Sequence, residues 1–133
     1  MGDVRVSLEH KLFGRRAESA AEQYLRGQGY RIRDRNVRSV YGELDLVVER
    51  DGVLIFVEVK ARRTDAYGGA PYAVDIRKQA RIIRLAAQYL AHHRLQNHAC
   101  RFDVLLCAGQ SADTGTIRHI ENAFDVPGGH LQW

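Results

Sequence analysis

The sequence predicts an α/β fold with a mixed β-sheet and helices packed on its faces. Two long segments carry apolar residues at helical spacing, and several shorter segments are alternately or almost wholly apolar. Clusters of glycine, proline and aspartate separate these segments. In chain order they predict a helix, three strands, a second helix and one or two further strands, which is an α/β arrangement.

The first helix is predicted from about Leu8 to Gln28. Apolar side chains recur there every three or four residues. Gly27 and Gly29 are typical of a helix C-terminus. Tyr30 to Arg35 then reads as a short strand.

Two strands forming a hairpin follow. The segments ELDLVVER and VLIFVEV flank Asp51-Gly52, and an Asp-Gly pair between apolar runs is a strong hairpin signal. The second segment is almost entirely apolar, which predicts a central strand covered on both faces.

The rest of the chain completes the predicted fold. A turn-rich loop leads to a second helix from about Asp75 to Arg94, with an apolar stripe. RFDVLLC is a further strand, and TIRHIE is predicted as the last one. We expect one domain over residues 1–124 and a C-terminal tail over 125–133, where Pro127-Gly128-Gly129 breaks any regular element.

Composition narrows the class of protein. A chain of 133 residues fits one domain with a real core. Lysine and arginine outnumber acidic residues by 20 to 16, a mild positive balance that permits a nucleic-acid partner without requiring one. Cys100 and Cys107 have no zinc-type spacing and are expected to be reduced thiols. No signal peptide or membrane span is visible, so we expect a cytoplasmic protein without a membrane partner.

Charged residues gather at one end of the predicted hairpin. With Asp51 and Gly52 as the turn, Asp45 faces Glu58 and Glu43 faces Lys60. Opposed like charges repel, so a divalent cation between Asp45 and Glu58 is indicated. The alternative is a set of exposed ion pairs, but burial on a central strand makes unpartnered charges costly. The register stays open here, because strand ends slip or bulge.

A third acidic group is available from the first helix. Glu18 and Glu22 both lie at the edge of its apolar stripe, and spacing does not decide between them. Either one could instead be an ordinary solvated residue.

These residues suit phosphodiester hydrolysis. Asp45 and Glu58 would hold Mg²⁺ or Mn²⁺, which lowers the pKa of a bound water and offsets charge on the phosphate. Lys60 would orient or activate that water, or stabilise the transition state.

Basic residues near this site indicate where nucleic acid would bind. Some directly follow the second hairpin strand, and the others share one face of the second helix, where they could hold successive phosphates. An ordinary solvated helix face is the alternative. The residues are Arg62, Arg63, Arg77, Lys78, Arg81 and Arg84.

Several motifs together resemble a known family. GELDL followed by FVEVKARR resembles the core of the PD-(D/E)xK nuclease superfamily. With GRRAESAAEQYL, GYRIRDRNVRS, YGGA, DIRKQARIIRLAAQYL, RFDV and HIENAF, the chain resembles the YraN-like family of small bacterial predicted endonucleases from about Phe13 to Phe124.

The resemblance implies a restriction-endonuclease-like fold, similar to that of archaeal Holliday-junction resolvases. By that similarity Asp45, Glu58 and Lys60 match the catalytic positions. Glu18 matches the helix glutamate that joins Asp45 and Glu58 at the metal, which favours it over Glu22.

The function expected from the resemblance is metal-dependent cleavage of branched or structured DNA in repair or recombination. DNA is favoured over RNA. A homodimer is one possible assembly, because the similar resolvases act as dimers, but the sequence shows no clear dimer seam. The alternative is a catalytically inactive nuclease-fold module that binds nucleic acid or a protein partner.

Overall fold

The computed structural model describes residues 3–62, 74–108 and 116–126, with side chains of the first helix from Gly14 onward. The elements in this part of the chain are α1 (Asp3–Gly27), β1 (Arg31–Ser39), β2 (Gly42–Arg50), β3 (Val53–Arg62), α2 (Ile76–His92), β4 (Cys100–Ala108) and β5 (Thr116–Ile120). The predicted α/β class and element order are confirmed. The strand predicted over residues 30–35 is longer than expected and continues to Ser39.

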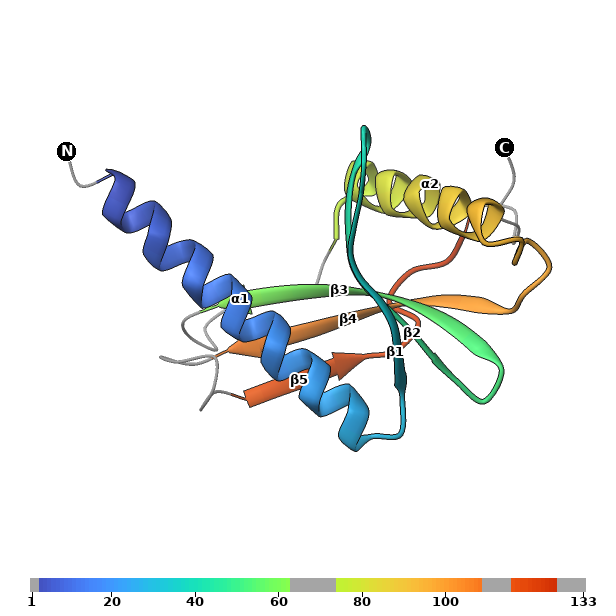
Figure 1. The fold of residues 1–133 in the computed structure, drawn as a ribbon, viewed down its shortest axis with the longest axis horizontal. Helices are drawn as coiled ribbons and strands as arrows, with labels where there is room; N and C mark the ends of the chain where they lie inside the picture. The colour runs from blue at the N-terminus through green and yellow to red at the C-terminus, as the bar shows by residue number, and fades with distance from the viewer. Residues whose placement is uncertain (1–2, 63–73, 109–115, 127–133) are drawn as a thin grey trace.

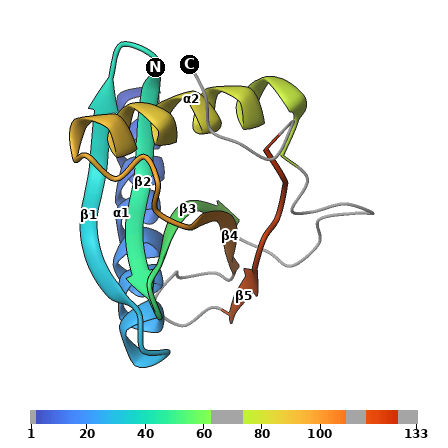
Figure 2. The same ribbon diagram turned by 90° about the vertical axis from the view of Figure 1, so that its right-hand side faces the viewer.

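The five strands form one mixed sheet in the order β1-β2-β3-β4-β5. All neighbours pair antiparallel except β3 and β4, which are parallel. The position of β3 at the centre is therefore as predicted. Helices α1 and α2 lie on opposite sides of the sheet (Figures 1 and 2).

Two apolar cores follow from the alternation of side chains along β3. Ile55 and Val57 face α1, whereas Leu54 and Phe56 face α2, and all four are at most 3% exposed. This is the division of faces that the sequence predicts. In the part of the chain that the structure describes, no helix combines the length and the apolar composition that a membrane crossing requires.

The hairpin register is confirmed near the turn and changes beyond it. Paired residues of β2 and β3 run from Arg50 and Val53 to Leu46 and Val57, as predicted. Asp45 and Glu58 lie just past the last pair, so the expected direct opposition of Asp45 with Glu58, and of Glu43 with Lys60, is not part of the ladder.

A twist in the β1–β2 ribbon explains this departure. Asn36, which lies opposite Asp45, has a positive φ of 52°. Leu44 packs in the α2-side core and Leu46 in the α1-side core, although residues two apart on a regular strand share a face. Beyond Asp45 the ribbon therefore leaves β3 and runs up beside α2 (Figure 1).

Helix α2 begins with a side-chain cap. The Asp75 carboxylate accepts a hydrogen bond of 2.8 Å from the Lys78 backbone N–H. The helix ends at His92, slightly before the predicted Arg94, which adopts a positive φ of 57°.

A buried polar network joins β4 to β5. Asp103 is 1% exposed and accepts hydrogen bonds from the Arg101 guanidinium at 3.0 and 3.1 Å. It also lies 2.7 Å from His119 Nε2 and accepts a bond from the Asn122 backbone N–H at 3.0 Å. Burial disfavours the ionised carboxyl, but these hydrogen bonds outweigh it and hold the pKa of Asp103 below its ordinary value. No local pattern in the sequence predicts this network.

Candidate active site

Four carboxylates gather where β2 leaves β3. Glu43 and Asp45 belong to β2, Glu58 to β3 and Glu18 to α1. We call these four residues the acidic cluster. Asp45 accepts a hydrogen bond from the backbone N–H of Val59, the residue after Glu58, which places these two acidic residues next to each other. The charges of Glu18 and Glu43 also act on Asp45.

Asp45 is the most perturbed member. Burial raises its pKa to about 8, with the negative charge of Glu58 next in effect and those of Glu18 and Glu43 weaker. One contact opposes this, because the carboxylate accepts a 2.8 Å hydrogen bond from the Val59 backbone N–H. If the pairing of β2 with β3 continued, the Val59 N–H would donate to a backbone carbonyl of β2. The Asp45 carboxylate accepts that hydrogen bond instead.

Glu18 and Glu22 occupy different electrostatic environments. Burial and the charges of Glu43 and Glu58 raise the pKa of Glu18, opposed in part by Arg15. Glu22 instead accepts hydrogen bonds from Arg35, which lower its pKa. Of the two helix glutamates, Glu18 therefore faces the acidic cluster.

Two lysines accompany the cluster. Lys78 of α2 places its Nζ atom 2.6 Å from Glu58 Oε1, and the Glu58 side chain is only 13% exposed. Lys60 lies two residues beyond Glu58 on β3, on the same face by strand alternation, and is partly buried. Sequence reasoning placed Lys78 among phosphate-binding residues and missed its contact with Glu58, because no local pattern relates α2 to β3.

The donor set fits a hard cation held by few protein ligands. No three or more Asp, Glu, His or Cys side chains in the described ranges are arranged to hold a metal ion together. Mg²⁺ commonly takes one or two carboxylates and completes its shell with waters and substrate phosphates. Asp45 and Glu58 match that pattern, since both offer oxygen donors and repel each other without a cation.

Basic side chains continue from the cluster along α2. Arg77, Arg81 and Arg84 are exposed, as the predicted helix face requires. The Arg84 guanidinium lies 4.0 Å from the centre of the Tyr41 ring, at the tip of the β1–β2 ribbon. The Arg62 side chain and Arg63 lie outside the described residues.

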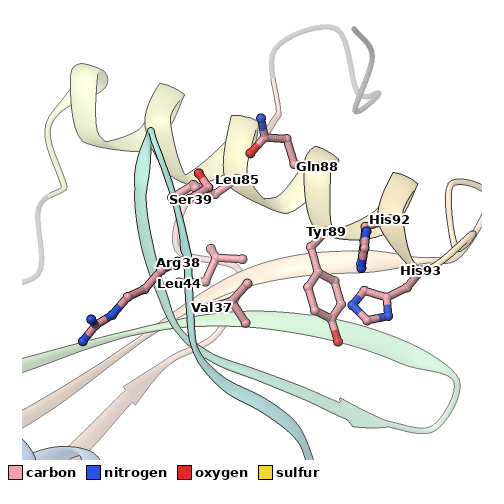
Figure 3. A pocket seen from close by; sticks show the side chains of 9 residues that line it. All are labelled: Val37, Arg38, Ser39, Leu44, Leu85, Gln88, Tyr89, His92 and His93. Carbon is pink, nitrogen blue, oxygen red and sulfur yellow. The ribbon is translucent and has the colours of Figure 1, made fainter.

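A pocket of about 410 Å³ lies between the β1–β2 ribbon and α2. Val37 and Leu44 point into it toward Tyr89, whereas Arg38 points away from Tyr89 on the other side of the ribbon (Figure 3). The Tyr89 hydroxyl accepts a hydrogen bond from Arg33 and donates one to Asp34. No member of the acidic cluster lines this pocket.

Comparison with known proteins identifies the family. The family described as "Uncharacterised protein family UPF0102" matches residues 17–107. The chain belongs to the UPF0102 family. Similar relatives include the UPF0102 proteins of Myxococcus xanthus, 41% identical over 89% of this chain and 93% of the relative. The UPF0102 protein of Syntrophotalea carbinolica is 45% identical over 86% of this chain and 93% of the relative. That of Frankia casuarinae is 47% identical over 84% of this chain and 94% of the relative.

The family assignment confirms the resemblance to YraN-like proteins. The UPF0102 match spans Glu18, Asp45, Glu58, Lys60 and Lys78, and it stops before β5. All of the candidate chemistry therefore lies in the part of the chain that defines the family.

Proposed function

We propose that this UPF0102 protein is a metal-dependent nuclease that hydrolyses phosphodiester bonds in branched or structured DNA, using Mg²⁺ or Mn²⁺. The observation that carries the proposal is the acidic cluster, in which neighbouring carboxylates and burial raise the pKa of Asp45 to about 8. Carboxylates held together against their repulsion weaken a fold, and such conflicts concentrate at functional sites.

Each residue has a distinct part in this reaction. Asp45 and Glu58 hold the cation from two rigid strands, which suits a site that needs precise geometry. When bound, the cation lowers the pKa of a water and offsets charge on the phosphate. Lys60 orients the attacking water or stabilises the charge that develops on the phosphate. Glu18 adds negative charge from α1, which would favour cation binding by Asp45 and Glu58.

Lys78 supplies the charge that the cluster needs before a cation arrives. Its 2.6 Å contact with Glu58 neutralises one carboxylate of the cluster. If Glu58 held a cation, the Lys78 ammonium would lose this partner and would be available to a substrate phosphate.

A nuclease-fold module that binds nucleic acid or a protein partner without cutting is the second candidate. The same Lys78–Glu58 pair favours it, because the ammonium already occupies a carboxylate oxygen that a cation would use. In that case the basic face of α2 would bind the partner, and the acidic cluster would bind no cation and catalyse no cleavage.

A cleavage panel tests the proposal. Purified protein would be incubated with Mn²⁺ or Mg²⁺ and labelled duplex, single strand, flap, four-way junction and RNA hairpin. Glu58→Gln and Glu18→Gln change the acidic cluster. Glu49→Gln on β2 and Glu22→Gln on α1 are matched controls, because both glutamates pair with arginines outside the cluster.

We expect wild type and both controls to cut branched DNA, and Glu58→Gln to lose about 100-fold or more in rate, as the loss of a main electrostatic stabiliser does. Equal cutting by wild type and Glu58→Gln would refute the site. Binding without cutting by any protein, read as band retardation on the same gels, would favour the binding module.

A further inference from the structure

The tip of the β1–β2 ribbon exposes apolar side chains. Val40 is 93% exposed and Tyr41 is 37% exposed. Among the side chains that the structure describes, which are those of residues 14–61, 74–108 and 116–126, the only other exposed large apolar one is Ile76. Two of the three such side chains therefore stand side by side on a projecting turn (Figure 1).

Turn chemistry does not account for Val40 and Tyr41. They form a two-residue loop between the paired residues Ser39 and Gly42. Such loops favour Asn-Gly or Asp-Gly, as in the other hairpin of this chain, where Asp51 has a φ of 53° and Gly52 a φ of 80°. At the β1–β2 tip the positive φ belongs to Gly42, the residue after the loop, with a value of 133°. The Tyr41 N–H donates a 3.1 Å hydrogen bond to Ser39 Oγ.

The tip is seated on α2 beside cationic side chains. The Tyr41 ring lies 4.0 Å from the Arg84 guanidinium. Gly42 approaches Arg81 so closely that an added Cβ would lie 3.3 Å from its Cδ. An arginine stacked on an aromatic ring, in a basic surface, is a platform on which a nucleobase can stack. An apolar side chain such as Val40 is of the type that enters a base step and unstacks it.

The tip stands at a fixed spacing from the acidic cluster, because both lie on β2. Tyr41 and Asp45 are four residues apart, which is at most about 13 Å along a strand. One DNA strand advances about 3.4 Å per nucleotide. The separation therefore corresponds to at most about four nucleotides.

We propose that the ribbon tip is an unstacking wedge for branched DNA. Val40 enters the weakly stacked base step at the branch, and the freed base stacks on Tyr41 and Arg84. A phosphodiester within about four nucleotides of the branch then meets the acidic cluster. The spacing part of this proposal rests on the proposed nuclease function. The wedge itself requires only binding, so the two are tested separately.

The first test measures base unstacking without cleavage. 2-Aminopurine is placed at the branch of a flap or four-way junction, and protein is added in EDTA. We expect fluorescence to rise several-fold with wild type and with Asp51→Asn, the control at the other hairpin turn. Val40→Ser and the double variant Val40→Ser/Tyr41→Ser should lose the rise. The preference of the double variant for branched over plain duplex DNA should fall about tenfold, the scale of one lost base–aromatic stack.

Folding and cutting are monitored in parallel. Val40→Ser alters a side chain that this chain does not pack, so its thermal unfolding should match wild type. With Mn²⁺, wild type should cut at a fixed position within about four nucleotides of the branch, and the double variant should lose that fixed position.

The outcomes separate the two proposals. Binding to branched DNA with no fluorescence rise, or a rise that survives in the variants, overturns the wedge and leaves the cleavage panel untouched. A rise without any cutting supports the wedge and refutes the nuclease. Absence of nucleic-acid binding, together with a dimer in light scattering that Val40→Ser abolishes, overturns the wedge and assigns the tip to contact between copies.

Discussion

Replacing Asp45 with asparagine is expected to stabilise the folded protein above neutral pH and to abolish cation binding. In the fold, burial and the charge of Glu58 raise the pKa of Asp45 from its ordinary 3.8 to about 8. Between these values the unfolded chain releases a proton that the folded protein keeps, so the wild-type free energy of unfolding falls as pH rises. Asparagine does not titrate and escapes this loss.

The gain in unfolding free energy expected for Asp45→Asn follows from the pKa shift of Asp45 and from the exposure of its carboxylate to solvent. About four pKa units at about 1.4 kcal/mol each give an upper bound near 6 kcal/mol. Solvent screening of a partly buried carboxylate reduces this, and we expect about 2 kcal/mol above pH 8 and almost nothing near pH 4. Asp45→Ala also removes the charge, but it leaves the Val59 N–H without its acceptor and should be about 1 kcal/mol less stable than Asp45→Asn.

Urea unfolding in EDTA between pH 4 and 9 measures these differences. Asp51→Asn, at an exposed turn, is the control and should show no such pH-dependent gain. Added Mn²⁺ should stabilise wild type and not Asp45→Asn, because a ligand stabilises only the fold that binds it. If Asp45→Asn is less stable than wild type at pH 8, the carboxylate is a structural group and the reasoning from repulsion fails.

Three further changes test other parts of the structure. Lys78→Met removes the ammonium paired with Glu58, so we expect thermal unfolding in EDTA to show about 1 kcal/mol of lost stability, which Mn²⁺ recovers. Asp103→Asn breaks the buried pair with Arg101 and should cost about 3–5 kcal/mol in urea unfolding. Wild type should lose that stabilisation as pH falls below about 4, since the pKa of Asp103 is lowered in the fold. Gly42→Ala should cost about 1–2 kcal/mol, because a φ of 133° strains any residue with a Cβ and that Cβ would crowd the Arg81 side chain at 3.3 Å.

Matched measurements decide each case. Failure of Mn²⁺ to recover Lys78→Met would show that no cation replaces the ammonium at Glu58. An Asp103→Asn variant within about 1 kcal/mol of wild type would contradict the buried network, given the usual cost of breaking one. Gly14→Ala is the control for Gly42→Ala, because a Cβ there meets nothing within 4 Å and alanine favours a helix. Equal effects at the two glycines would refute the strain argument.

The fold followed from local patterns. Periods of two and of three to four residues in the apolar positions are set by the geometry of strands and helices, so they fix element type and order without reference to the rest of the chain. The apolar run of β3 likewise required a strand covered on both faces, and the Asp51-Gly52 turn set the register as far as Leu46 and Val57.

Two features of the structure differ from or were missed by the sequence predictions, and both depend on interactions between segments that are distant in the chain. Nothing in the sequence around Asn36 and Asp45 showed that β2 would leave β3, because the twist depends on how the ribbon packs against α2. The network of Asp103 and His119 was missed for the same reason, since residues 16 apart meet only once β5 pairs with β4.

The sequence by itself determined the α/β class, the central position of β3 and the presence of Asp45, Glu58 and Lys60 at one end of the hairpin. Spacing left Glu18 and Glu22 open, and the family resemblance already favoured Glu18. Tertiary structure alone decided that Lys78 pairs with Glu58 and that Tyr41 meets Arg84 at the ribbon tip. Periodicity reports which face of its own element a side chain occupies. Only packing determines which faces of different elements meet, and the candidate chemistry of this protein lies where they do.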